Sequence, residues 1–203
     1  AVLTGGYDAL SRFAWIGLSV LRTMSRSAVR PFDKNRDGTL FSEGAGALLL
    51  ESEESARARG APVYAELAGY ALNNNAFHMT APAREGAGTA AVLRRALEDA
   101  GVAPEEVDHI NAHGTGTQPN DVTETQAIKA VFGAHAARIP ITSNKGVLGH
   151  LMGAAGSVEA IAAILSLREG LIPPTRLELE PDPACDLDYV VREPRRATLR
   201  VAL

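Results

Sequence analysis

The sequence has one cysteine, no long apolar run and no excess of basic residues, and each shortage excludes a class of protein. Cys185 is the only thiol among the 203 residues, so an internal disulfide is excluded and a reducing compartment such as the cytoplasm is expected. The strongly apolar stretches, such as 45–50 and 160–165, are far shorter than the roughly 20 residues of a bilayer-spanning helix. A formal net charge of −4 gives no sign of the positively charged surface that nucleic-acid binding requires. We therefore expect neither a membrane protein nor a nucleic-acid-binding protein.

The sequence does contain alternating strand and helix patterns, which are typical of an α/β fold with mostly parallel strands. Strands are predicted at residues 1–6, 44–51, 63–70, 107–113, 138–143 and 197–203. Helices are predicted at residues 52–60, 86–100, 121–132 and 153–168. The last helix is apolar nearly all round, so we expect it to be buried. Both ends of the chain have the pattern of strands inside a longer folded protein.

His113 is the first candidate for chemistry. It lies in NAHGTGTQPND, residues 111–121, directly after a predicted strand and before a glycine turn. Ligands of parallel α/β sheets bind beyond the carboxyl ends of the strands, which is where this histidine is placed. The alternative is a histidine that is merely hydrogen-bonded into its loop.

A second candidate segment is SNKGVLGHLMGAAG, residues 143–156. Lys145 follows a predicted strand, and His150 precedes a predicted helix after a glycine loop. The exposed N–H groups of a helix N-terminus disfavour an imidazolium, so His150 is expected to be neutral and to donate a hydrogen bond to a developing oxyanion. The glycines fit neither GxGxxG nor GxxxxGK[ST], which argues against a nucleotide-binding loop.

The segment DKNRDGTLFSEG resembles half of a calcium-binding loop. Asp33, Asn35, Asp37 and Gly38 have the spacing of the first ligands and the turn glycine of an EF-hand. Glu43 comes one residue too early for the closing ligand, and an apolar strand pattern follows in place of the exit helix. We therefore expect a structural turn and no metal site.

Taken together, four segments resemble, in order and spacing, the β-ketoacyl-(acyl-carrier-protein) synthases of fatty-acid and polyketide assembly. They are residues 30–51, 111–117, 144–156 and 181–190. The nearest similarity is to the type II elongating condensing enzymes of the thiolase-like superfamily. This resemblance implies a layered αβαβα fold, here mainly its C-terminal half. Residues 1–60 would end the first half, and residues 61–203 would form the second, without its last glycine-rich segment.

The resemblance also implies an activity and partners. The family moves an acyl chain from the phosphopantetheine of a carrier protein to an enzyme cysteine, decarboxylates malonyl-carrier protein and joins the two groups. It implies no metal, redox or nucleotide cofactor, because the phosphopantetheine belongs to the carrier-protein substrate. The partners would be an acyl carrier protein and a second ketosynthase subunit, in a homodimer or a heterodimer. A polyketide ketosynthase and a non-catalytic partner resembling a chain length factor are the alternatives, and a calcium-binding module is a remote third.

Site residues follow from the same resemblance. His113 and His150 would polarise the malonyl thioester oxygen, with Lys145 holding them in register. The substrate-binding residues would be Thr115, Thr117 and Thr80, and residues 77–80 would line the acyl or pantetheine channel. Glu124 and Asn111 would support the histidines and the lysine, although Glu124 could equally be a solvated helix carboxylate.

The nucleophilic cysteine of the family has no counterpart in this sequence. In the family it lies at a strand-to-helix turn upstream of the first matching segment. Cys185 lies in a predicted loop without a neighbouring base, so we expect it to be structural. The chain is thus expected to supply the two histidines and the lysine of the site, and to be inactive in acyl transfer by itself.

Overall fold

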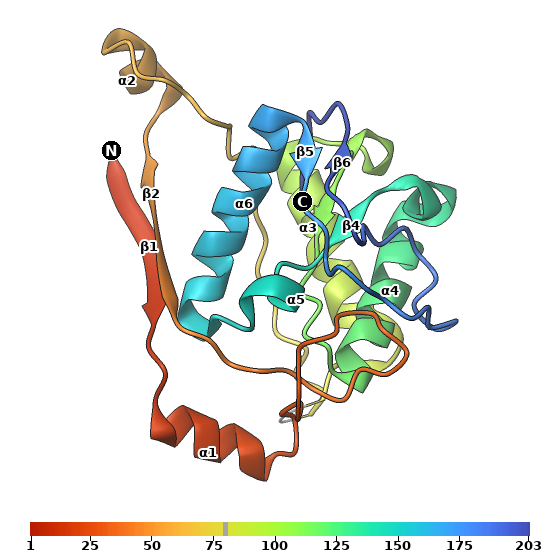
Figure 1. Cartoon of the computed structure of the whole chain (residues 1–203). Coiled ribbons are helices and arrows are strands. Elements are labelled where there is room, and N and C mark those ends of the chain that lie inside the picture. Colours follow the sequence, from red (N-terminus) through yellow and green to blue (C-terminus); the bar gives the residue numbers. More distant parts are fainter. Residues whose placement is uncertain (79–80) are drawn as a thin grey trace.

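The computed structural model describes residues 1–78 and 81–203, and its elements alternate between strand and helix over most of that length (Figure 1). The strands are β1 (Val2–Asp8), β2 (Gly44–Leu50), β3 (Ile110–Asn111), β4 (Ile141–Thr142), β5 (Leu171–Ile172) and β6 (Arg195–Arg196). The α-helices are α1 (Arg12–Val20), α2 (Glu53–Ala58), α3 (Ala87–Ala100), α4 (Gln118–Phe132), α5 (Lys145–Leu148) and α6 (Ala155–Glu169). Short 3-10 turns are η1 (Arg84–Gly86), η2 (Pro104–Glu106), η3 (Gly133–Arg138) and η4 (Met152–Ala154).

The hydrophobic core surrounds the parallel pair β3 and β4, in which Ile110 lies opposite Ile141. Parallel bridges extend this pair on both sides, from His109 to Ala202 and from Ile141 to Tyr189. Helices α3 and α4 pack over the core and contribute buried side chains to it. The core is therefore of the mixed α/β type that the sequence predicts, with its central segments parallel.

An antiparallel ribbon of β1 and β2 stands apart from this core, with α6 beside it (Figure 1). Glycines allow the ribbon to approach η4 and the start of α6 closely. A Cβ atom on Gly6 would lie 2.1 Å from the carbonyl oxygen of Gly153, and one on Gly46 would lie 2.8 Å from Oγ of Ser157. This contact fixes η4, and with it the residues that follow His150.

Three predictions of secondary structure or burial are wrong. Residues 197–203 form only an isolated bridge, at Ala202, and the last strand is β6 at Arg195–Arg196. Residues 63–70 are extended, but no strand of the described residues pairs with them. Helix α6 is not buried all round, because only Ala155 and Ser166 are buried and Leu165 is exposed. Periodicity reports the apolar faces of a segment, whereas strand pairing and burial depend on which neighbours cover those faces.

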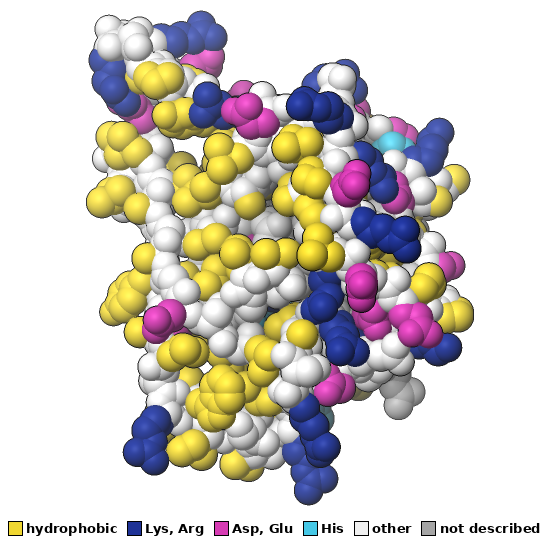
Figure 2. Space-filling model, in the orientation of Figure 1, with side chains coloured by type: hydrophobic (Ala, Val, Ile, Leu, Met, Phe, Trp, Pro, Cys, Tyr) yellow, Lys and Arg dark blue, Asp and Glu magenta, His cyan; other side chains and the backbone are white. Residues whose placement is uncertain are grey.

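Exposed apolar side chains are concentrated on the β1–β2 ribbon and α1 (Figure 2). Phe13 and Val20 of α1, and Leu3 and Tyr7 of β1, are largely exposed. Such a surface is typical of a region that contacts other protein. Within residues 1–78 and 81–203, no helix has the length and apolarity required to cross a membrane.

Candidate active site

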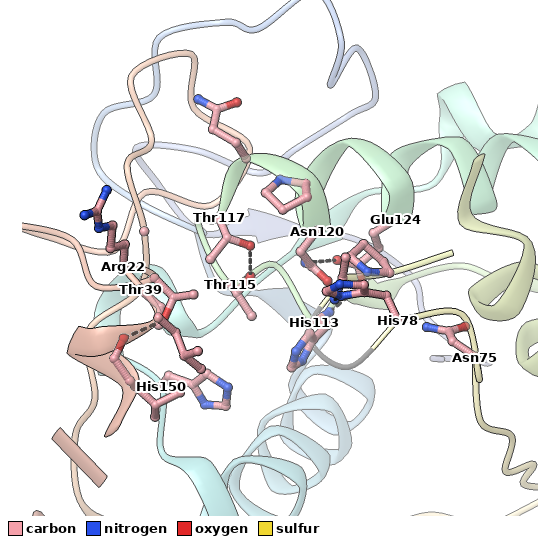
Figure 3. Close-up of a pocket in the computed structure, with 18 of the residues that line it drawn as sticks. Arg22, Thr39, Asn75, His78, His113, Thr115, Thr117, Asn120, Glu124 and His150 are labelled. Atoms are coloured by element: carbon pink, nitrogen blue, oxygen red, sulfur yellow. Dashed lines mark hydrogen bonds between the residues drawn. The ribbon is translucent and has the colours of Figure 1, made fainter. Parts of the chain in front are cut away.

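A cavity of about 1120 Å³ lies beyond the C-terminal end of β3, where the sequence analysis placed His113 (Figure 3). Three parts of the chain form its walls. They are residues 18–41, residues 73–78 together with 81–89, and residues 113–124, with His150 and Met152 completing the lining. The cavity thus joins segments that are far apart in the sequence around both candidate histidines.

The position of His113 is fixed by hydrogen bonds to the backbone of its turn. Glu124, on α4, accepts hydrogen bonds from the backbone N–H of His113 at 2.7 Å and of Gly114 at 2.8 Å. Burial raises the pKa of Glu124 to about 7, although the two N–H donors oppose this rise. The interpretation of Glu124 as a solvated surface carboxylate is therefore wrong. Its contact is with the turn that carries His113 and not with the lysine.

His150 faces His113 across the cavity, and their ring centroids are 5.6 Å apart at an interplanar angle of 86°. The backbone N–H of Met152 donates to Nδ1 of His150 at 3.1 Å. A neutral His150 with this acceptor carries its proton on Nε2, which is then the available donor. Figure 3 shows both rings projecting toward the same space.

Both histidines are kept neutral. Burial is the main cause that lowers the pKa of His150, and the positive charge of Lys145 lowers it further. The same two causes lower the pKa of His113, with a further contribution from His150. Two neutral imidazoles are therefore expected near pH 7, each able to donate one N–H group.

Lys145 lies behind the cavity and does not line it. Its side chain is 1% exposed, and Nζ lies 2.5 Å from Oε1 of Glu159 on α6. Asn111 reaches the same residue, since its Nδ2 donates to the backbone oxygen of Glu159 at 3.0 Å. Glu159 is not among the residues predicted from the sequence. Two features of the sequence point to it: Glu159 is the only charged residue between positions 151 and 167, and a buried lysine requires a counter-charge.

Two of the three predicted substrate-binding residues line the cavity. Thr115 and Thr117 both line the cavity, with their hydroxyl oxygens 2.9 Å apart. His78 lines the cavity as well, whereas Phe77 is exposed. Thr80 and Met79 lie outside the described residues.

The segment that resembles a calcium loop is a structural turn. Asp33 uses one carboxylate oxygen for the backbone N–H of Asn35 and the other for that of Glu180, both at 2.7 Å. Oδ1 of Asp37 accepts the hydroxyl of Ser25 at 2.6 Å. In the described part of the chain, no cluster of three or more His, Cys, Asp or Glu could hold a metal ion. The carboxylates therefore anchor the turn to neighbouring chain segments.

Cys185 does not belong to the cavity. It is 5% exposed and packs in the core with Phe32 and Tyr189. Burial raises the pKa of its thiol, which keeps it protonated and unreactive.

Comparison with protein families shows to which family the chain belongs. Residues 64–177, more than half of the chain, match the model "Beta-ketoacyl synthase, C-terminal domain", and residues 1–56 match "Beta-ketoacyl synthase, N-terminal domain". The chain belongs to the β-ketoacyl synthase family. It is 45% identical over 210 residues to 3-oxoacyl-[acyl-carrier-protein] synthase 2 of Synechocystis, and 44% identical over 209 residues to the Staphylococcus aureus protein of the same name. These matches cover 100% of this chain but 50% and 52% of the relatives, so the chain spans about half their length.

Solved ketosynthases have the same fold. The ishigamide ketosynthase/chain length factor is 48% identical with a TM-score of 0.94, over 98% of this chain and 49% of the other. A type II polyketide ketosynthase in complex with its acyl-carrier protein is 39% identical with a TM-score of 0.94, over 98% of this chain and 51% of the other. A β-ketoacyl synthase from Burkholderia phymatum is 40% identical with a TM-score of 0.92, over 97% of this chain and 49% of the other. The predicted α/β, thiolase-like ketosynthase fold is thereby confirmed.

Proposed function

We propose that this chain supplies the decarboxylating part of a β-ketoacyl synthase site, which condenses malonyl-carrier protein with an acyl group in fatty-acid biosynthesis. The observation that supports it is the pair of neutral histidines, His113 and His150, whose rings face each other at 5.6 Å across an open cavity. A thioester oxygen in the cavity beside the two rings, within reach of both, would meet two N–H donors and no competing positive charge on the rings themselves.

The two donors suit the charge that decarboxylation creates. When the bond between the malonyl α-carbon and its carboxylate breaks, carbon dioxide leaves, and the electron pair is shared between the α-carbon and the thioester oxygen. Hydrogen bonds to that oxygen become stronger as its negative charge grows, so they stabilise the transition state more than the bound substrate. The α-carbon then attacks the carbonyl carbon of the acyl thioester, and the acyl sulfur leaves as a thiolate.

Lys145 acts on this step through the histidines. Its buried ammonium favours the neutral form of both rings, and its ion pair with Glu159 fixes it behind them. We propose that the hydroxyls of Thr115 and Thr117 bind the phosphopantetheine arm of the carrier protein in the cavity. No cofactor of the enzyme is needed for this chemistry.

The acyl group must be held by a cysteine other than Cys185, because that thiol is buried outside the cavity. The chain by itself is therefore expected to perform no acyl transfer. An acyl carrier protein is the proposed partner, and the solved complex of a related ketosynthase with its carrier protein supports this proposal.

Single-histidine variants of the full-length protein test the assignment. His113→Ala and His150→Ala should each lower the rate of malonyl-carrier decarboxylation about 10²- to 10³-fold, as for loss of one oxyanion donor. His135→Gln serves as the control, since His135 lies in η3 outside the cavity, and it should retain the wild-type rate. Decarboxylation by either alanine variant within threefold of wild type would refute the assigned roles.

A second candidate is a polyketide subunit, either a ketosynthase or a non-catalytic partner resembling a chain length factor. It is suggested by two related structures that contain a ketosynthase with a chain length factor. The exposed apolar face of β1 and α1 is consistent with a subunit contact. Retention of both histidines and Lys145 favours the catalytic subunit. A full-length protein that activates a separate ketosynthase but cannot decarboxylate malonyl-carrier protein would instead establish the non-catalytic partner.

A further inference from the structure

Thr39 combines two properties that no other described residue shares. It lines the cavity, and its hydroxyl is a buried polar group without a hydrogen-bond partner. The residue is only 5% exposed. A buried hydroxyl without a partner destabilises a fold, since it has lost its hydrogen bonds to water without gaining others. Among the described residues this hydroxyl has no hydrogen-bond partner, so it remains available to a ligand of the cavity.

The backbone on either side of Thr39 is bound to the two parts of the candidate site. Gly38 donates its N–H to the backbone oxygen of Gly116 at 3.0 Å, and Gly116 lies between the two predicted pantetheine-binding threonines. His150 donates its backbone N–H to the oxygen of Leu40 at 2.8 Å. Thr39 is consequently held between the turn that follows His113 and the segment that carries His150.

The local conformation points the side chain of Thr39 toward the histidines. Residues two apart in an extended segment face the same side. Phe41 lines the cavity, and its ring centroid lies 5.9 Å from that of His150. The backbone of Thr39 is already satisfied, because its N–H donates to Thr23 and its oxygen accepts from Ser25. Only the hydroxyl remains available, and staggered rotamers about 120° apart in χ1 allow it to turn toward a ligand.

We propose that Thr39 contacts the substrate and donates a hydrogen bond to the carboxylate of the bound malonyl group. This inference rests on the proposed function. The two imidazole N–H groups are assigned to the thioester oxygen, so the malonyl oxygens left to bind are those of the carboxylate, close to the same histidines. A hydroxyl is a neutral donor, which can hold the carboxylate without opposing its departure as strongly as a cation would.

Such a contact has a distinct kinetic signature. The hydrogen bond exists while the carboxylate carries its charge and weakens as that charge moves to the thioester oxygen. It therefore stabilises the bound substrate more than the transition state, so its loss raises KM without lowering kcat.

The test compares Thr39→Val, which keeps the shape and removes the hydroxyl, with Thr39→Ser, which keeps the hydroxyl, in the full-length protein. Thr39→Val should raise KM for malonyl-carrier protein about tenfold, the size expected for a hydrogen bond to a charged group, with kcat no lower than about half that of wild type. Thr39→Ser should restore KM to within about threefold. As a matched control, Thr123→Val removes a hydroxyl that is bonded to the backbone of Pro119 and does not line the cavity, and it should leave both constants unchanged.

Thermal melting without substrate provides an independent readout. Removal of an unpartnered buried hydroxyl should leave the melting temperature of Thr39→Val at or above that of wild type. A lower melting temperature would show that the hydroxyl has a partner within the protein and would overturn the inference. An unchanged KM, or a fall in kcat equal to that in kcat/KM, would overturn it as well. If wild type decarboxylates malonyl-carrier protein and Thr39→Val behaves like it, the inference alone fails. If wild type has no decarboxylase activity, the proposed function fails and the inference fails with it.

Discussion

Replacement of Glu159 by glutamine should destabilise the protein by about 3 kcal/mol, because it leaves a buried ammonium without its counter-charge. Lys145 is 1% exposed, and Glu159 is the only carboxylate in an ion pair with it among the described residues. Removal of one partner from a buried pair generally costs 3–5 kcal/mol. We expect the lower end of this range because the Glu159 side chain is 17% exposed, so water partly screens the pair.

Urea unfolding at pH 7, followed by circular dichroism, measures this effect as a change in the transition midpoint. Glu169→Gln is a matched control on the same helix, since Glu169 is exposed near the C-terminus of α6, and its effect should stay within about 0.5 kcal/mol. The double variant Lys145→Met with Glu159→Leu should recover most of the lost stability, because it removes both charges and keeps the volume. A loss below about 1 kcal/mol for Glu159→Gln, or no recovery in the double variant, would refute the buried-charge explanation.

Two further predictions concern stability. Burial lowers the pKa of His109 from 6.5 to about 4, so as the pH falls this histidine is protonated in the unfolded chain before it is protonated in the folded one. The stability that its neutral form contributes is therefore complete above pH 6.5 and is lost as the pH falls toward 4. Urea unfolding across this range should show wild type losing about 3 kcal/mol more than His109→Leu, and parallel pH profiles would contradict this. Gly146→Ala should cost about 3 kcal/mol, because the new Cβ would lie 2.1 Å from the backbone oxygen of Thr175. Gly156→Ala, whose Cβ meets no atom within 4 Å, should be neutral or stabilising, and equal melting temperatures for the two variants would refute the steric argument.

Local signals in the sequence predict the elements well where backbone chemistry alone decides. Gly60 and Gly101 lie at the ends of the helices predicted at residues 52–60 and 86–100, and both have the positive φ that such ends require. The position of His113 beyond a strand follows from the general geometry of parallel sheets, and the cavity lies there. These features depend on a few neighbouring residues, so a single sequence is sufficient to identify them.

Contacts between distant segments cannot be predicted from local patterns in the sequence. Residues 63–70 have a strand-like composition, but Val63, Tyr64 and Leu67 remain exposed. The segment is held by a cation–π contact of Arg168 with Tyr64 and by a hydrogen bond from the backbone N–H of Tyr70 to Asp99. Their sequence does not reveal whether a neighbouring strand is available to pair with them. The partner of Lys145 and the unpaired hydroxyl of Thr39 are likewise properties of segments more than ten residues apart that meet only in the folded chain.

The arrangement of charges around the cavity explains how Lys145 affects two histidines to which it donates no hydrogen bond. Two imidazolium rings 5.6 Å apart would repel each other and would also be repelled by a buried ammonium. Lys145 therefore biases both rings toward the neutral form, while Glu159, which does not line the cavity, balances its charge. The pair has no net charge, yet Lys145 and not Glu159 is among the causes that lower the pKa of each histidine. Loss of Glu159 should consequently weaken the fold, whereas loss of Lys145 should raise the pKa of both histidines.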